Sequence, residues 1–270
     1  MITFSSAAGS PDKENEDWVG ATANAIVVLD GLSAPEGVGG CWHGTPWYVG
    51  KLGPRILMHA SDPEIDLPNA LATAIQEVAD SHSSTCVLSD PATPSSTVAI
   101  ARRRGENLDA LVLADSSVIV ATDDNVDLLS DVRVDTSVPD EQQAALTAPA
   151  GPERERRVAE LVRAQQRVRN RAGGYWVAQA DPNVAQQALT RTWTWSSVRR
   201  VAVLTDGATR PADTFDALTW SGLLDLLSSQ GPQVLITETR RLEAADPAGI
   251  KWPRYKGRDD ATAAFWSVRP

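Results

Sequence analysis

The chain has 270 residues, of which 42% are hydrophobic and 22% charged, as in an ordinary globular protein of one large or two small domains. Its net charge of −10 argues against non-specific binding to nucleic acid or to an anionic membrane. We see no apolar run long enough to span a membrane and no secretory signal, so we expect a cytoplasmic protein. The only two cysteines, Cys41 and Cys86, favour free thiols over a disulfide framework.

Short apolar runs bounded by turn residues predict the strands. In chain order, the predicted strands are 1–8, 23–30, 95–102, 108–114, 117–122, 125–131, 198–206 and 261–268. Short turns between the strands of the segment 95–131 are typical of an antiparallel meander.

Apolar residues at helical spacing predict the helices between these strands. The predicted helices begin after Pro46 in the segment 41–58 and then cover 66–83, 139–146, 153–171, 220–229 and 232–245. We expect a loop over 32–40, and residues 174–195 form a tryptophan-rich connection whose structure the pattern does not predict. No linker or repeat divides the chain, so residues 1–270 are expected to form a single α+β domain with helices on the faces of antiparallel sheets.

Four predicted strands carry an aspartate at one end, namely Asp30, Asp115, Asp206 and Asp259. If these ends meet, the carboxylates repel one another, which raises their pKa values or requires cations. Hard divalent cations with oxygen ligands are the usual answer. Taken one at a time, the same aspartates could simply form turns, because Asp-Gly is common there.

Six short motifs, in this order, resemble those of the metal-dependent protein phosphatases of type 2C, the PPM family. They are Asn-Glu-Asp at 15–17, Asp-Gly at 30–31, Ser-Ser-Thr-Val-Ala at 95–99, Ala-Asp-Ser at 114–116, Leu-Thr-Asp-Gly at 204–207 and Asp-Asp-Ala-Thr at 259–262. The resemblance covers nearly the whole chain. It implies a four-layer α-β-β-α sandwich with two central antiparallel sheets.

The resemblance also implies a function, the hydrolysis of phosphoserine and phosphothreonine in a phosphoprotein substrate. The nucleophile would be a hydroxide bridging two Mn²⁺ or Mg²⁺ ions, and some family members hold a third, weaker metal. Such a centre can activate water at neutral pH and clamp a phosphoryl group.

Carried over by position, Asp30 would bridge both metals and the carbonyl of Gly31 would complete one site. Asp206 and Asp259 would hold the other metal. Asp260 stands where the family has asparagine, so Asp259 is the expected ligand.

The resemblance assigns catalytic roles to two further aspartates. Asp17 would act through metal-bound water, and Asp115 would contact that water network or bind a third metal. The family's phosphate-binding arginine falls at Asp12 here, so Lys13 beside it is a candidate substitute. The histidine that eukaryotic members carry after Asp-Gly is missing, which makes His43 a candidate proton donor near the phosphate.

Three alternatives remain open from the sequence. The chain could be a weakly active or inactive member of the fold that binds a partner, or a phosphatase of small molecules. A Ser-His-Asp hydrolase is disfavoured, because only three histidines are present and no Gly-x-Ser-x-Gly motif occurs. The oligomeric state and the physiological substrate are not predicted.

Overall fold

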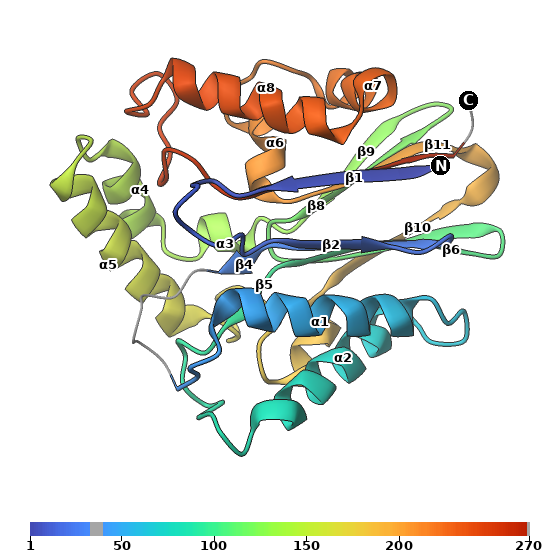
Figure 1. The fold of residues 1–270 in the computed structure, drawn as a ribbon, viewed down its shortest axis with the longest axis horizontal. Helices are drawn as coiled ribbons and strands as arrows, with labels where there is room; N and C mark the ends of the chain where they lie inside the picture. The colour runs from blue at the N-terminus through green and yellow to red at the C-terminus, as the bar shows by residue number, and fades with distance from the viewer. Residues whose placement is uncertain (33–39, 269–270) are drawn as a thin grey trace.

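Two five-stranded antiparallel sheets packed face to face form the centre of the computed structural model, which describes residues 1–32 and 40–268 (Figure 1). The first sheet has the order β1 (Ile2–Ala7), β12 (Ala261–Ser267), β11 (Val198–Leu204), β8 (Ser117–Thr122), β9 (Val126–Ser130). The second sheet has the order β10 (Leu189–Thr194), β7 (Asn107–Leu113), β6 (Val98–Arg104), β3 (Ala25–Leu29), β2 (Trp18–Ala21). A two-stranded sheet pairs β4 (Gly31–Leu32) with β5 (Ser95–Ser96).

Helices cover both outer faces of the sandwich, which confirms the predicted α-β-β-α architecture (Figure 1). Helices α1 (Gly44–Ala60) and α2 (Leu67–His82) pack on the second sheet. The first sheet is covered by α6 (Asp206–Asp213), α7 (Trp220–Gln230) and α8 (Pro232–Ala245). At one end lie α3 (Arg133–Thr136), α4 (Pro139–Thr147) and α5 (Pro152–Val168), and the 3₁₀ turns are Pro182–Gln187 and Trp195–Ser197.

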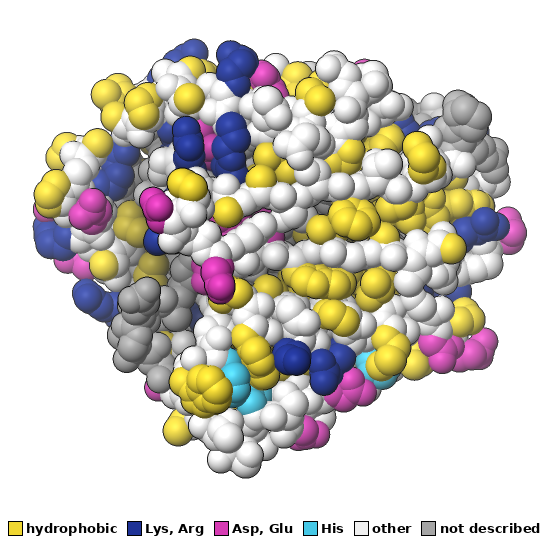
Figure 2. Space-filling view, in the orientation of Figure 1, with side chains coloured by type: hydrophobic (Ala, Val, Ile, Leu, Met, Phe, Trp, Pro, Cys, Tyr) yellow, Lys and Arg dark blue, Asp and Glu magenta, His cyan; other side chains and the backbone are white. Residues whose placement is uncertain are grey.

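The central strands are apolar on both faces because each face is covered. In β3, Val27 and Leu29 pack against α1 and α2, whereas Ile26 and Val28 pack against the other sheet. Hydrophobic side chains remain visible at the edge between β1 and β2, where the two sheets face each other (Figure 2). Because both faces of these strands are buried, their sequences are continuously apolar and do not alternate between apolar and polar residues.

Several elements differ from the sequence-based prediction. The helix expected after Pro46 already begins at Gly44, since proline is tolerated in a first helical turn. The connection 174–195, for which no structure was predicted, contains the edge strand β10, in which only Trp193 is buried. A strand that buries one side chain gives no apolar pattern, so it could not be recognised. The loop predicted over 32–40 lies largely outside the described residues, within which no helix is both long and apolar enough to cross a bilayer.

Arg102 on β6 links the second sheet to the turn between α1 and α2. Its guanidinium is 1% exposed and pairs with Asp109, at 3.3 Å between Nη2 and Oδ2. Nη1 donates to the carbonyl oxygens of Ala60, Asp62 and Ile65. A buried charge with this many partners is costly to remove, because the partners are left unsatisfied.

We therefore predict that Arg102→Ala lowers the free energy of unfolding by about 3–5 kcal/mol, measured by urea denaturation. The matched control is Arg103→Ala, one residue along the same strand, where the side chain is exposed and stacks over Trp195. That control is expected to change the free energy by no more than about 1 kcal/mol. Equal effects of the two substitutions would contradict the assigned role of Arg102.

Candidate metal centre

A cavity of about 560 Å³ opens at the end of the sandwich where the predicted aspartates lie. Residues from α3, α4 and α5 form one wall, and the ends of strands form the other. Six carboxylates line it: Asp30, Asp115, Asp135, Asp206, Asp213 and Asp259. The structure thus brings together four aspartates that are far apart in sequence, as their positions at strand ends predict.

Asp30 follows directly after β3, where the chain passes from the second sheet into the small third one. Its carbonyl oxygen accepts a 2.9 Å hydrogen bond from Thr97 N–H. Gly31 also lines the cavity, and a side chain there would lie only 2.5 Å from the carbonyl oxygen of Glu16. The glycine of the first Asp-Gly pair is therefore required by close packing of two backbone segments.

Asp206 enters the cavity from the first turn of α6, which starts where β11 ends. The neighbouring strand β12 brings Asp259 and Asp260 to the same place. A side chain at Gly207 would overlap the carbonyl oxygen of Asp260, so the second Asp-Gly pair also marks a backbone contact. The carboxylate of Asp260 instead accepts hydrogen bonds from the N–H groups of Gly9 and Glu16, at 2.8 and 2.6 Å. Asp260 thus fixes the segment that carries the first acidic motif.

Asp17 lies beside this centre and is 8% exposed. Thr205 donates its hydroxyl to Oδ2 of Asp17 at 3.0 Å and accepts the N–H of Thr262 at 2.9 Å. Oδ1 of Asp17 and Oδ1 of Asp206 are both buried and have no hydrogen-bond partner among the described residues. An unpaired buried carboxylate oxygen is costly unless a cation or a donor meets it.

Burial and mutual repulsion raise the pKa values of this group. The pKa of Asp30 lies well above its ordinary value because the side chain is desolvated and faces the charges of Asp17, Asp206 and Asp259, with Asp115 adding a smaller effect. Burial raises the pKa of Asp17 as well, although contacts with hydroxyl groups oppose the rise. The pKa of Asp115 rises to about 8, through burial and then the charge of Asp206. The cluster therefore lacks positive charge.

Two of the four basic side chains that line the cavity pair with its carboxylates, and both bind Asp259. Lys256 Nζ is 2.9 Å from Oδ1 of Asp259, and Arg210 Nη2 is 3.2 Å from Oδ2. Arg210 is also held by the buried Glu243 at 2.6 Å. Neither cation was predicted from the sequence. Two signals were available, the position of Arg210 four residues after Asp206 in a helix and the basic run before Asp259.

The donor set fits hard divalent cations. Asp30, Asp206 and Asp259 supply oxygen ligands at one cavity, and two unpaired oxygens and raised pKa values mark a site that gains stability from added positive charge. Mg²⁺ and Mn²⁺ prefer such ligands.

Two further residues, Ala114 and Asp135, have properties at this site that were not predicted from the sequence. Ala114, which replaces the glycine of the family's Gly-Asp-Ser motif, has φ +67°, a left-handed conformation that costs alanine roughly 1–2 kcal/mol. Alanine is therefore strained at this position. Asp135 on α3 was not recognised from the sequence. Its pKa is raised by burial and then by the charges of Asp206 and Asp213.

The structure does not bring the two predicted phosphate-binding residues to the cavity. Lys13 is exposed in the loop between β1 and β2 and is not among the residues that line the cavity. His43 lies before α1 beside the two cysteines, with Nδ1 3.3 Å from Sγ of Cys86. A local sequence pattern could not show this, because the position of both side chains depends on loops. In the described part of the chain, the basic residues that line the cavity are Arg169, Arg210, Arg254 and Lys256, of which Arg210 and Lys256 pair with Asp259.

The fold and the carboxylate cluster define an α-β-β-α sandwich with a candidate divalent-metal centre at one end. The chain belongs to the protein phosphatase 2C family, whose model matches residues 9–237. The match ends before Asp259. The assignment of Asp259 as a candidate ligand therefore rests on the structure and on the sequence motif. The search of curated proteins found no match.

Solved structures of bacterial phosphatases share this fold. The serine/threonine phosphatase Stp1 from Staphylococcus aureus is 14% identical, with a TM-score of 0.60 over 100% of this chain and 95% of that one. The Mycobacterium tuberculosis phosphatase PstP/Ppp is 16% identical, with a TM-score of 0.59 over 100% and 99%. The PstP catalytic domain in complex with two manganese ions is 16% identical, with a TM-score of 0.57 over 98% and 96%.

We predict that Gly207→Ala lowers the free energy of unfolding by about 1–3 kcal/mol, because the added methyl group meets the backbone of Asp260. Gly50→Ala is the matched control, since Gly50 is exposed on α1 with open space around it. In this control, the higher helix propensity of alanine is expected to raise the free energy of unfolding by up to about 1 kcal/mol. Chemical denaturation measures both, and a Gly207→Ala protein as stable as the native chain would rule out the backbone contact.

We predict that Asp30→Asn makes the metal-free protein more stable at pH 8. A raised carboxyl pKa means that ionisation of Asp30 destabilises the folded state, and this cost grows as the pH rises above the ordinary value near 4. In the presence of a chelator at pH 8, the melting temperature of the Asp30→Asn variant should therefore exceed that of the native chain. The increase should be roughly 2–4 °C for each kcal/mol gained in the free energy of unfolding. The difference should vanish near pH 4.

The control for this measurement is Asp124→Asn, at an exposed position in the turn between β8 and β9. Its melting temperature should follow that of the native chain across the same pH range. If Asp30→Asn were less stable than the native chain at pH 8 in chelator, the repulsion inferred at this site would be wrong.

Proposed function

We propose that this chain is a metal-dependent protein phosphatase that hydrolyses phosphoserine and phosphothreonine in proteins. The observation that carries the proposal is the cluster of Asp30, Asp206 and Asp259 at one cavity, with Asp17 beside it and two buried oxygens unpaired. Family membership supports it. A neighbour of the same fold was solved with two manganese ions, which supports Mn²⁺ or Mg²⁺ as the cofactor.

The carboxylates have separate roles in the proposal. Asp30, Asp206 and Asp259 would hold two divalent cations, with the carbonyl of Gly31 as a further ligand. Cations bound there would supply an activated water at neutral pH and positive charge against the phosphoryl group. Asp17, fixed by Thr205, would orient a water from the buried side of the cluster. Asp115 lines the same cavity and would act on that water network or hold a third cation.

We assign phosphate binding to Lys256 in place of Lys13. Lys256 lines the cavity, and its Nζ atom contacts Asp259, an expected metal ligand. A cation taken up by Asp259 competes for that carboxylate, so the ammonium group becomes available to an incoming phosphate. Arg210 is less available because Glu243, which is 1% exposed, holds its other end.

The wall opposite the carboxylates suits a protein substrate. Apolar side chains of α4 and α5, including Leu146, Val158, Leu161 and Val162, line the cavity opposite the strand ends. Such a wall can pack against residues that flank a phosphorylated side chain, whereas a small phosphate ester would leave it uncovered. No disulfide joins Cys41 and Cys86, which supports the expected cytoplasmic location. Net charge gives no support to nucleic acid or membrane as a partner.

We predict that Asp30→Ala and Asp206→Ala each lower Mn²⁺-dependent phosphate release from phosphothreonine peptides by more than about 100-fold. That loss exceeds the 10–100-fold typical of an outer-sphere partner of a metal. Asp124→Ala should retain full activity. Circular dichroism of each variant checks that the fold is intact.

Other outcomes would point to the alternatives. Retained turnover in both variants contradicts the site. Bound Mn²⁺ without turnover by the native chain favours a binding module on this fold. Faster turnover of small phosphate esters than of phosphopeptides favours a small-molecule phosphatase.

A further inference from the structure

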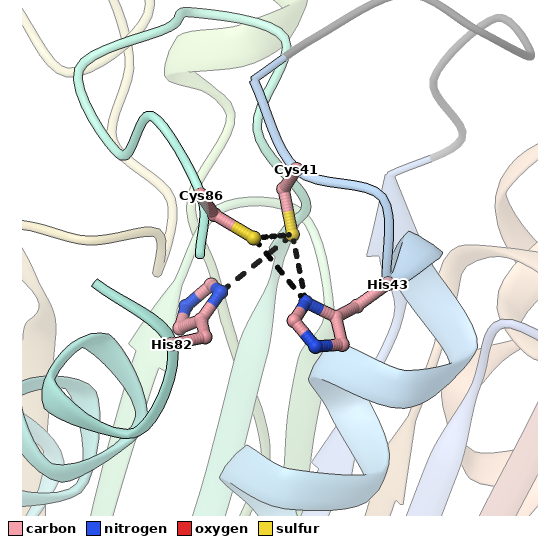
Figure 3. A group of neighbouring side chains, drawn as sticks. All are labelled: Cys41, His43, His82 and Cys86. Carbon is pink, nitrogen blue, oxygen red and sulfur yellow. Dashed lines mark hydrogen bonds between the residues drawn. The ribbon is translucent and has the colours of Figure 1, made fainter. Parts of the chain in front are cut away.

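Two cysteines and two histidines converge at the start of α1, on residues that the phosphatase site does not use (Figure 3). Cys41 Sγ lies 3.3 Å from Cys86 Sγ and 3.4 Å from Nδ1 of His43. Cys86 Sγ is 3.3 Å from the same nitrogen, and Cys41 Sγ is 3.6 Å from Nδ1 of His82. One ligand atom from each of the four residues lies within 4.8 Å of all the others.

The fold delivers these side chains from two segments about forty residues apart. Cys41 and His43 immediately precede α1, whereas His82 is the last residue of α2. The turn after α2 is closed by Cys86 N–H, which donates to the carbonyl oxygen of His82 at 3.0 Å. One residue later, Val87 N–H donates to Gly40 at 2.7 Å and so joins the two segments beside the cluster.

The separations are close to those of a tetrahedral metal site. With Zn–S near 2.3 Å and Zn–N near 2.0–2.1 Å, a regular tetrahedron places a sulfur and a nitrogen ligand about 3.5 Å apart and two sulfur ligands about 3.8 Å apart. The three sulfur–nitrogen distances of 3.4, 3.6 and 3.3 Å lie near the first value, and the sulfur–sulfur distance of 3.3 Å is shorter than the second. A disulfide, in contrast, needs its sulfurs about 2.05 Å apart.

The chemistry of the donors points to zinc rather than to the hard cations of the acidic cavity. Two sulfurs and two imidazole nitrogens form the Cys₂His₂ set of structural zinc sites. Burial and then the neighbouring His43 lower the pKa of His82, which favours the neutral imidazole that binds metal. Burial raises the pKa of the Cys41 thiol, while backbone N–H groups at the start of α1 oppose the rise.

The surroundings partly shield the site from solvent, with Cys41 and His43 half-buried. Trp42 and Trp47 stack on the two faces of the His43 ring, each at 4.0 Å between centroids. His82 is 3% exposed and Cys86 9%. Histidine side chains lie beside large hydrophobic ones below the start of α1 (Figure 2). Four protein ligands leave no open position for substrate, so the site would be structural rather than catalytic.

We propose that Cys41, His43, His82 and Cys86 bind one structural zinc ion that fastens the start of α1 to the end of α2. Two residues after His43, Thr45 donates its hydroxyl to the carbonyl oxygen of Leu32 at 3.2 Å. The ion would thereby support the segment that presents Asp30 and Gly31 to the acidic cavity. This inference does not depend on the proposed phosphatase activity.

The test is the metal content of the full chain, expressed with added zinc and dialysed, by mass spectrometry of the elements. The native chain should retain about one zinc ion, and a mercurial that binds thiols should release it. Cobalt substitution should give the absorption of a tetrahedral sulfur-ligated ion. Cys41→Ser with Cys86→Ser should lower retained zinc at least about tenfold.

Matched variants separate this site from the acidic one. His59→Ala changes a histidine of α1 that pairs with Glu77 outside the cluster, and it should keep its zinc. Asp30→Asn should also keep its zinc while losing Mn²⁺ at the acidic cavity. The mercurial and cobalt measurements use the native chain, so they decide the question even if the double cysteine variant fails to fold.

Three results would overturn the proposal. The native chain could retain no zinc, or it could lose zinc on Asp30→Asn but not on the cysteine substitutions. It could also contain a Cys41–Cys86 disulfide when isolated under reducing conditions and analysed by mass.

Discussion

Repulsion between buried carboxylates is the physical constraint on which the rest of this structure depends. Strand ends from both sheets bring Asp30, Asp115 and Asp206 together in a space where burial alone already disfavours their charges. Lys256 and Arg210 offset only part of this cost, because both bind Asp259. The fold therefore holds together a set of groups that would separate if they were free to do so. Divalent cations bound at this cavity would relieve the repulsion, and their binding would connect the architecture to phosphate-ester hydrolysis.

The sheets and the acidic centre could be predicted because both depend on local patterns in the amino-acid sequence. A strand covered on both faces is continuously apolar, and its end is marked by Asp-Gly, as at Asp30 and Asp206. The glycines of these pairs also indicate backbone contacts, since Gly31 and Gly207 lie where another backbone segment passes too close for a side chain.

The remaining features depend on tertiary contacts that no local pattern records. Lys256 reaches the cavity from the loop between α8 and β12, whereas Lys13, which looked suitable from sequence, lies exposed in another loop. The edge strand β10 buries only Trp193 and so lacks a strand signature. Cys41 and Cys86 were expected to be free thiols. Their proximity was not predicted, because it requires α1 and α2 to pack in antiparallel fashion. The two proposed sites differ in their ligands and therefore in the metals they prefer. The acidic cavity offers oxygen ligands, whereas the site beside α1 offers sulfur and imidazole ligands.

The central claim, that the acidic cavity binds divalent cations, is tested most directly by anomalous X-ray diffraction from crystals grown with Mn²⁺. Our account predicts manganese peaks within ligand distance of the carboxylates of Asp30, Asp206 and Asp259. A cavity without manganese at saturating Mn²⁺, with the carboxylates held by Arg210, Lys256 or shared protons instead, would contradict it.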